Sequence, residues 1–256
     1  MNEEGAGDEA KNGHSYDKSK EYWEKIEPTV NGMLGGFSRI SNKDSESSIR
    51  FLSSFFELRN SNFNSNQPAR SRSTSPEDVE LIDGRVLANG GRALDCGAGI
   101  GRVTKNVLLK FFDKVDLLEQ SQSFLDKAKD HIGSELFDKH VGHVFCSGLQ
   151  NFEPPPEIKY DLVCCQWVTG YLTDDDFVVF LRKCQTLLNK PNGILFVKDN
   201  HTSSGEEDAD MGDSSVTRPY WKLIELFKKA GLELVLERRQ VKFPKGLYPV
   251  KMFALR

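Results

Sequence analysis

The pattern of apolar positions along this chain changes near residue 88. Beyond it, short apolar runs typical of buried strands alternate with segments whose apolar residues recur at helical spacing. The runs predict strands at residues 93–96, 114–118, 143–146, 160–165, 193–198, 232–237 and 250–255. Helices are expected at residues 104–112, 124–131 and 218–230, and after residue 173, where three aspartates suit a first helical turn. This alternation predicts an α/β fold whose ligands bind at the carboxyl ends of parallel strands.

The last two predicted strands break the alternation. Only the link "RRQVKFPKGLYP" (residues 238–249) joins them, which leaves no room for a crossover helix. We therefore expect a Rossmann-like, seven-stranded, mostly parallel sheet whose last strand is antiparallel. Upstream, residues 22–36 and 45–58 predict short helical pieces around the glycine-rich turn "GMLGGFS", an N-terminal helical extension to this sheet.

Two segments lack the apolar positions that a core requires. Residues 1–20 are rich in Gly, Glu, Asp and Lys, and we expect them to form a disordered tail. The Ser-, Asn- and Arg-rich stretch "RNSNFNSNQPARSRSTSPED" begins a segment, residues 59–91, that we expect to be a flexible insertion. The remaining chain, residues 21–256, is expected to form a single domain.

Composition narrows the classes of function. The chain has 256 residues, a net charge of −4 and a pI near 5.8, so its overall field gives no reason to expect nucleic acid or an acidic membrane as a partner. The five cysteines have no Cys-x-x-Cys spacing and the five histidines no metal-binding spacing, so we assign no disulfide framework and no metal. Without a signal peptide or a long apolar span, the expected localisation is cytoplasm and nucleus.

A glycine-rich stretch, "ALDCGAGIGR" (residues 93–102), leaves the first strand and enters the following helix. Gly97, Gly99 and Gly101 would allow a tight turn that a ligand can approach closely. Their G-x-G-x-G spacing departs from the dinucleotide fingerprint. Glu119 ends the second strand, where a carboxylate can accept hydrogen bonds from both hydroxyls of a ribose. Taken together, these features favour a nucleoside-type ligand over a merely structural turn.

Several motifs carry a resemblance to a known family. "DCGAGIGR", "GLQNF", "QWV", "VKDN", "DSSV" and "FALR" resemble the motifs of eukaryotic protein N-terminal Xaa-Pro-Lys N-methyltransferases, the α-N-methyltransferase branch of the S-adenosylmethionine-dependent enzymes. The likeness runs over residues 22–256 and fails in the tail and the insertion. It implies a class I methyltransferase fold with S-adenosyl-L-methionine (AdoMet) as cofactor. The implied substrates are proteins that begin Xaa-Pro-Lys or Xaa-Pro-Arg. Separately from the resemblance, we expect a monomer or weak oligomer.

The resemblance also implies which residues contact AdoMet. They lie in the N-terminal segment, the glycine loop and the ends of three strands: Trp23, Gly97, Arg102, Glu119, Gln120, Ser121, Leu149, Gln150 and Gln166. Arg102 is expected to hold the methionine carboxylate, and Gln166 to lie on the adenosine side. The family usually has Asp in place of Glu119, and we expect the longer side chain still to reach a ribose. Trp23 could instead anchor its own helix to the core.

Substrate contacts are implied at the ends of the fourth and fifth strands and beyond. Asn200 would bond the backbone of the first substrate residue, and Trp167 would pack against the proline. Asp210 and Asp213 would face the cation at position three, although an acidic run such as "GEEDADMGD" is by itself more typical of a solvated loop. The remaining contacts implied for the pocket are Ser215, Tyr248, Leu34 and Gly35.

One position departs from the family pattern. Tyr171 stands where the family has a His that is regarded as the acid/base partner of the residue matching Asp213. A tyrosine with a pKa of about 10 is a poor base at neutral pH. We therefore expect Asp213 to accept the amine proton alone. Tyr171 is expected to orient the amine and, with Trp167, to face the methylammonium charge by a cation–π contact.

Two other functions stay open on these residues. A methyltransferase for a small amine would need a closed pocket rather than a groove for an extended chain. A cofactor-binding subunit without activity is the other possibility, and Tyr171 is the feature that supports it. Incubation with labelled AdoMet and hexapeptides beginning Ser-Pro-Lys or Ser-Gln-Lys separates the three, and methylation of neither peptide would count against the protein N-terminal methyltransferase.

Overall fold

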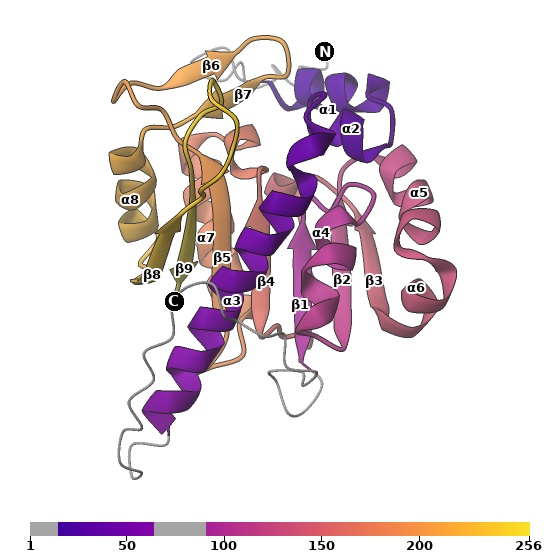
Figure 1. Ribbon diagram of the computed structural model, residues 1–256, viewed down its shortest axis with the longest axis vertical. Coiled ribbons are helices and arrows are strands. Elements are labelled where there is room, and N and C mark those ends of the chain that lie inside the picture. The colour runs from indigo at the N-terminus through magenta and orange to yellow at the C-terminus, as the bar shows by residue number, and fades with distance from the viewer. Residues whose placement is uncertain (1–14, 64–90) are drawn as a thin grey trace, which may run out of the picture.

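The computed structural model describes residues 15–63 and 91–256, so most of the predicted tail and insertion lie outside the described residues. Seven strands form one sheet in the order β3-β2-β1-β4-β5-β9-β8 (Figure 1). Their bounds are β1 Arg92–Cys96, β2 Lys114–Glu119, β3 Val141–Cys146, β4 Leu162–Gln166, β5 Ile194–Asn200, β8 Leu234–Arg239 and β9 Val250–Leu255.

Strand direction agrees with the prediction. β1 to β5 pair in parallel, whereas β9 is antiparallel to both β5 and β8. Because the link from β8 is too short for a crossover, β9 returns beside β8 and fills the place next to β5. The expected mostly parallel sheet with a reversed last strand is confirmed.

Helices cover both faces of the sheet (Figure 1). On one face lie α3 (Ser41–Phe63), α4 (Arg102–Asn106), α5 (Gln122–Ile132) and α6 (Ser134–His140), and on the other α7 (Asp174–Leu187) and α8 (Tyr220–Lys229). Successive strand residues point to opposite faces, so one strand serves both cores. In β1, Ala93 joins the cluster that contains Phe56 of α3, while Leu94 joins the cluster that contains Phe177 of α7.

Two smaller units stand at the carboxyl ends of the parallel strands (Figure 1). One consists of α1 (Tyr16–Lys25) and α2 (Val30–Met33), and the other is a hairpin of β6 (Asp208–Asp210) and β7 (Ser215–Thr217). Both lie at the sheet edge where an α/β fold binds its ligands.

Several predicted boundaries are wrong. Ser15 caps α1 by accepting a hydrogen bond from the Lys18 amide at 3.3 Å, so residues 16–20 are helical and do not belong to a tail. α3 continues to residue 63, which places residues 59–63 in a helix rather than in the insertion. The helix expected at residues 104–112 is the short α4 followed by a 3₁₀ turn, Leu108–Lys110.

α6 and the β6–β7 hairpin were not predicted. The hairpin arises in a run of acidic residues without apolar alternation, so its strands have no periodic signal in the sequence. Over residues 15–63 and 91–256, no helix combines the length and apolar character needed to cross a bilayer.

Candidate active site

Two cavities open at the carboxyl ends of the strands and share part of their walls. The first cavity lies over the glycine loop and the end of β2, and the second lies between α1, α2, the β6–β7 hairpin and the segment before β9. The side chains that line both are Trp23, Met33, Leu34, Trp167 and Tyr171. Groups bound in the two cavities would therefore meet at these shared residues, which we call the neck.

Most of the predicted cofactor residues line the first cavity. They are Trp23, Gly97, Arg102, Glu119, Gln120, Leu149, Gln150 and Gln166. Ser121 is not among the lining residues; instead its backbone N–H donates to Glu119 Oε1 at 2.9 Å. Ser121 therefore orients the predicted ribose-binding carboxylate.

Glu119 is held by the backbone at the end of β2. Its Oε2 accepts the Gly99 N–H at 2.9 Å, and only 8% of the residue is exposed. Burial raises the pKa of Glu119 above its usual value, although the hydrogen bonds from Ser121 and Gly99 oppose the shift. Each carboxylate oxygen has a second acceptor site. The carboxylate thus faces the cavity with acceptor capacity for two hydroxyl groups.

The glycine loop forms the tight turn that the spacing predicts. Gly97 (φ +69°) and Gly99 (φ +56°) both lie in the region where a side chain is strained. A Cβ on Gly97 would lie 2.6 Å from a Val168 methyl group, and one on Gly99 would lie 2.5 Å from the Met33 sulfur. The glycines therefore also make room for protein side chains from the neck and its surroundings, which the sequence does not reveal.

A buried carboxylate behind the first cavity was missed from the sequence. Asp44, in α3, is fully buried and bonds Arg102 Nη1 at 2.8 Å and Gln166 Nε2 at 2.7 Å. Its other oxygen pairs with Lys198 Nζ at 2.5 Å. Gln166 Oε1 accepts a hydrogen bond from Ser48 at 3.2 Å, so both polar ends of the amide predicted to lie on the adenosine side bond to α3, beside Arg102.

The charges of this Asp44 cluster do not cancel. Lys198, the lysine of "VKDN", is buried and also donates to the Asp44 carbonyl and to Ser48 Oγ, each at 3.0 Å. Burial lowers its pKa, and the charge of Asp44 opposes that shift. With both cations protonated, the cluster holds two positive charges against one negative charge. The excess positive charge, with Arg102 in the cavity wall, suits an anionic ligand group.

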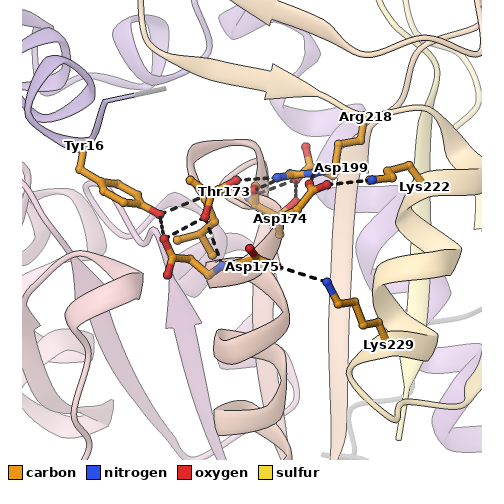
Figure 2. Close-up of polar contacts among 11 residues, drawn as sticks. Tyr16, Thr173, Asp174, Asp175, Asp199, Arg218, Lys222 and Lys229 are labelled. Atoms are coloured by element: carbon orange, nitrogen blue, oxygen red, sulfur yellow. Dashed lines mark hydrogen bonds and ion pairs between the residues drawn. The ribbon is translucent and has the colours of Figure 1, made fainter. Parts of the chain in front are cut away.

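α1 covers the first cavity, with Tyr16 and Trp23 in its lining. The Tyr16 hydroxyl donates to Asp176 and accepts the Thr173 N–H at 3.3 Å, so it ties α1 to the start of α7 (Figure 2). Burial and, to a smaller extent, the hydrogen bond to Asp176 raise the pKa of Tyr16 to about 12. At neutral pH the tie is therefore a protonated hydroxyl on a carboxylate. Trp23 contacts Phe124 and Tyr171 edge to face at 6.0 and 5.8 Å.

Tyr171 and Asp213 meet at the neck. The Tyr171 hydroxyl donates to Asp213 Oδ2 at 2.7 Å, and Asp213 Oδ1 accepts the Ser215 N–H at 2.9 Å. Burial, together with the negative charge of Asp213, raises the pKa of Tyr171 well above its usual value. Tyr171 therefore stays protonated and serves as a hydrogen-bond donor to Asp213 rather than as a base.

The second cavity is an acidic groove that contains every residue predicted for the substrate. Those residues are Leu34, Gly35, Trp167, Asn200, Asp210, Asp213, Ser215 and Tyr248. Asp199 and Asp208 add to its carboxylates, and no Lys, Arg or His of the described residues lines it. The Tyr248 hydroxyl donates to Asp208, which the sequence did not single out. This groove favours a cationic, extended ligand.

Comparison with known proteins decides the family. The profile of a family described as AdoMet dependent proline di-methyltransferase matches residues 11–72 and 81–256. The chain belongs to this family. Zebrafish N-terminal Xaa-Pro-Lys N-methyltransferase 1 is 42% identical over 94% of this chain and 95% of its own, and the human protein of that name is 41% identical over the same shares. A solved AdoMet-dependent methyltransferase from Leishmania major is 34% identical, with a TM-score of 0.74 over 97% of this chain and 87% of its own.

The chain is thus an AdoMet-dependent methyltransferase of this family, and its first cavity is a suitable cofactor site. Glu119 offers acceptors for ribose hydroxyls, and Arg102 with the Asp44 cluster offers positive charge for the methionine carboxylate. Bound AdoMet supplies an electrophilic methyl group. The neck is where a nucleophile from the acidic groove would reach it.

Trp167 of the methyltransferase has an unusual conformation at the neck. Its φ is +55°, a region that is strained for a bulky residue, and its backbone N–H donates to the Lys198 carbonyl at 2.9 Å. The Arg102 guanidinium carbon lies 5.6 Å and Lys198 Nζ 5.9 Å from the indole ring. The strained turn therefore directs one indole face to the Asp44 cluster while the side chain lines both cavities.

Proposed function

We propose that this enzyme methylates the α-amino group of proteins whose N-termini begin Xaa-Pro-Lys or Xaa-Pro-Arg. The observation that carries the proposal is the Tyr171–Asp213 pair at the neck, with the acidic groove leading away from it. The names of the curated relatives support the same substrate class.

An α-amine suits a site with a single carboxylate base. An α-amino group has a pKa of about 7.7–8.0, so reaching its neutral form at pH 7 costs only about 1.4 kcal/mol. A lysine side chain would require about 4.6 kcal/mol. Asp213, held by Tyr171 and the Ser215 N–H, needs only to take up a proton that the amine releases readily.

The groove residues have separable roles in this proposal. Asp213 accepts the amine proton. The Tyr171 hydroxyl donates its hydrogen bond to Asp213, and its oxygen retains acceptor capacity for an amine N–H. Trp167 packs against the proline ring and Asn200 bonds the first residue's backbone. Asp210, in the hairpin, faces the cation at position three. This arrangement supports the expected orienting role of Tyr171 and adds that Tyr171 also orients Asp213.

Two alternatives are less well supported. A small amine would not need a groove that extends from α2 past the β6–β7 hairpin to Tyr248. An inactive partner subunit would not need Tyr171 bonded to Asp213 at 2.7 Å beside the cofactor cavity.

The test is a methylation assay with labelled AdoMet and three hexapeptides. They are one beginning Ser-Pro-Lys, its Ser-Gln-Lys variant, and the Ser-Pro-Lys peptide with an acetylated N-terminus. We expect mass shifts of one or more methyl groups on the first peptide only. Methylation of the acetylated peptide would show that the enzyme methylates the lysine side chain instead of the α-amine. Methylation of none of the peptides would contradict the proposal.

We also propose that the enzyme works in the cytoplasm and nucleus as a monomer or weak oligomer. All five cysteines are free thiols, as a reducing compartment favours. Imaging of the tagged protein and analytical ultracentrifugation test these two statements, and a secreted protein or a tight oligomer would contradict them.

A further inference from the structure

The residues just before α7 form a single 3₁₀ turn, Thr169–Tyr171, that presents Tyr171 to the neck. Its internal hydrogen bonds are Tyr171 N–H to the Val168 carbonyl and Leu172 N–H to the Thr169 carbonyl, both at 3.2 Å. One such turn has poor hydrogen-bond geometry and little stability of its own. The groups that bond it from outside must therefore determine where Tyr171 lies.

Arg218 is the main external group on one side of the turn. It is 3% exposed, and its Nη1 and Nη2 donate to the Thr169 carbonyl at 3.1 Å and the Leu172 carbonyl at 2.5 Å. Its Nε donates to Asp174 Oδ1 at 2.8 Å, at the start of α7 (Figure 2). One guanidinium thus bonds both ends of the turn and the helix that follows it.

Asp199 and the backbone of β7 hold the turn from other directions. Asp199 Oδ2 accepts the Thr169 N–H at 3.2 Å and the Thr169 hydroxyl at 2.5 Å. A Cβ on Gly170 would lie 2.9 Å from the Val216 carbonyl oxygen, so the turn lies directly against β7.

The short segment around β7 carries both the proposed base, Asp213, and the arginine that bonds the turn, Arg218. Asp213 precedes β7 and Arg218 follows it, so the bonds from Arg218 fix the turn relative to the strand that begins next to Asp213. We propose that Arg218 is a positioning residue for methyl transfer, which holds the Thr169–Tyr171 turn so that the Tyr171 hydroxyl meets Asp213. The inference rests on the proposed function only for its kinetic readout.

Arginine is needed at this position because its planar fork donates in several fixed directions at once. A lysine would keep a positive charge for Asp174 but could not bond both carbonyls in the same geometry. If Arg218 were only an ion-pair partner of Asp174, Arg218→Lys would leave the turn unchanged, and any effect would be independent of Tyr171.

The first test does not require a substrate. Hydrogen exchange followed by mass spectrometry is measured on the full-length enzyme, on Arg218→Lys and on the control Lys222→Met. Lys222 Nζ binds the other oxygen of Asp174 at 2.9 Å and bonds neither carbonyl of the turn. We expect faster exchange of residues 168–173 in Arg218→Lys but not in the control. Unchanged exchange in Arg218→Lys would overturn the inference.

The second test is a double-mutant cycle with the Ser-Pro-Lys peptide. Because Arg218 acts through one hydrogen bond of Tyr171, we expect Arg218→Lys to lower kcat about two- to tenfold, with the KM for AdoMet unchanged. In a Tyr171→Phe background the same substitution should change kcat less than twofold. Additive losses, or full activity in Arg218→Lys, would refute the positioning role. If the wild-type enzyme methylates no peptide, the proposed function fails while the exchange experiment still decides the inference.

A milder variant guards against loss of folding in Arg218→Lys. Asp174→Asn keeps the guanidinium and its two carbonyl bonds but weakens its anchor at Nε. It should accelerate exchange of residues 168–173 to a smaller extent and lower kcat in the same direction, again only when Tyr171 is present. No change in either measurement would count against the proposal.

Discussion

The cofactor half and the substrate half of the site are each organised by a buried charge, and the two charges have opposite signs. Behind the cofactor cavity, the Asp44 carboxylate gathers three side chains, those of Arg102, Gln166 and Lys198. Behind the groove, the Arg218 guanidinium gathers two backbone carbonyls and the Asp174 carboxylate (Figure 2).

The two halves differ in which groups remain buried when Asp44 or Arg218 is removed. Without Asp44, two cations stay buried without their carboxylate, which is among the most costly changes in a protein interior. Without Arg218, the groups left behind are two neutral carbonyls and two aspartates: Asp174, which Lys222 also binds, and Asp199, which keeps its hydrogen bonds from Thr169 and Asn200. Loss of the charge behind the cofactor cavity should therefore lower the free energy of unfolding, whereas loss of the charge behind the groove should mainly lower turnover.

The largest effect is expected for Asp44→Ala. Leaving Arg102 and Lys198 unpaired should lower the free energy of unfolding by about 3–5 kcal/mol and weaken AdoMet binding. Urea denaturation and calorimetric titration with AdoMet measure the two quantities. Glu46→Ala, an exposed carboxylate in the same helix, is the control and should change neither. If the two variants are equally stable, Asp44 does not organise the cofactor half.

Asp213→Asn should come next, with a loss confined to turnover. The amide can still accept the Ser215 N–H but cannot take the amine proton, so kcat should fall at least about tenfold. The unfolding free energy and the AdoMet affinity should stay at wild-type values. Steady-state kinetics with the Ser-Pro-Lys peptide measures the change, and retained activity would exclude Asp213 from proton transfer.

Asp210→Asn should affect substrate binding more than turnover. Removing a carboxylate that faces the cation at position three should raise the KM for the Ser-Pro-Lys peptide about fivefold, as for a partly solvated ion pair. A peptide with Gln at position three should bind the wild type and the variant equally. Glu207→Gln, an exposed neighbour outside the groove lining, is the matched control. An equal loss with both peptides would show that Asp210 does not bind this cation.

The last predictions concern Tyr171 and pH. Because burial and Asp213 raise its pKa well above its usual value, Tyr171 keeps its proton throughout the working range. The value of kcat/KM should therefore rise with pH through the α-amine pKa of about 7.7–8.0, and Tyr171 should add no ionisation of its own below pH 10. Tyr171→His should add a group that titrates near about pH 6.5. A wild-type profile with that second limb would contradict the single-base arrangement.

Tyr171→Phe tests the hydrogen bond itself. The variant keeps the aromatic ring against Trp23 but loses the donor to Asp213, so kcat at pH 7.5 should fall about two- to tenfold. Full activity at this pH would show that Tyr171 orients neither Asp213 nor the amine.

Much of this fold was accessible from the sequence because parallel strands are buried on both sides. Their apolar runs identified all seven strands of the sheet, and the short link after β8 predicted the reversed last strand. Since ligands bind where such strands end, Glu119 could be assigned to a site before any contact was known. The resemblance to known motifs added Trp167, Asp210, Asp213 and the departure at Tyr171.

The supports of the site depended on tertiary contacts. Asp44 and Ser48 show a weak signal, as polar residues at helical spacing on the buried face of α3, but nothing local links them to Lys198 or Gln166. Arg218 follows an unpredicted hairpin, and its partners lie more than forty residues earlier in the chain. Periodicity records which face of an element is buried. The partner of a buried charge is set only when distant elements pack, because its energy depends on distances of a few ångströms.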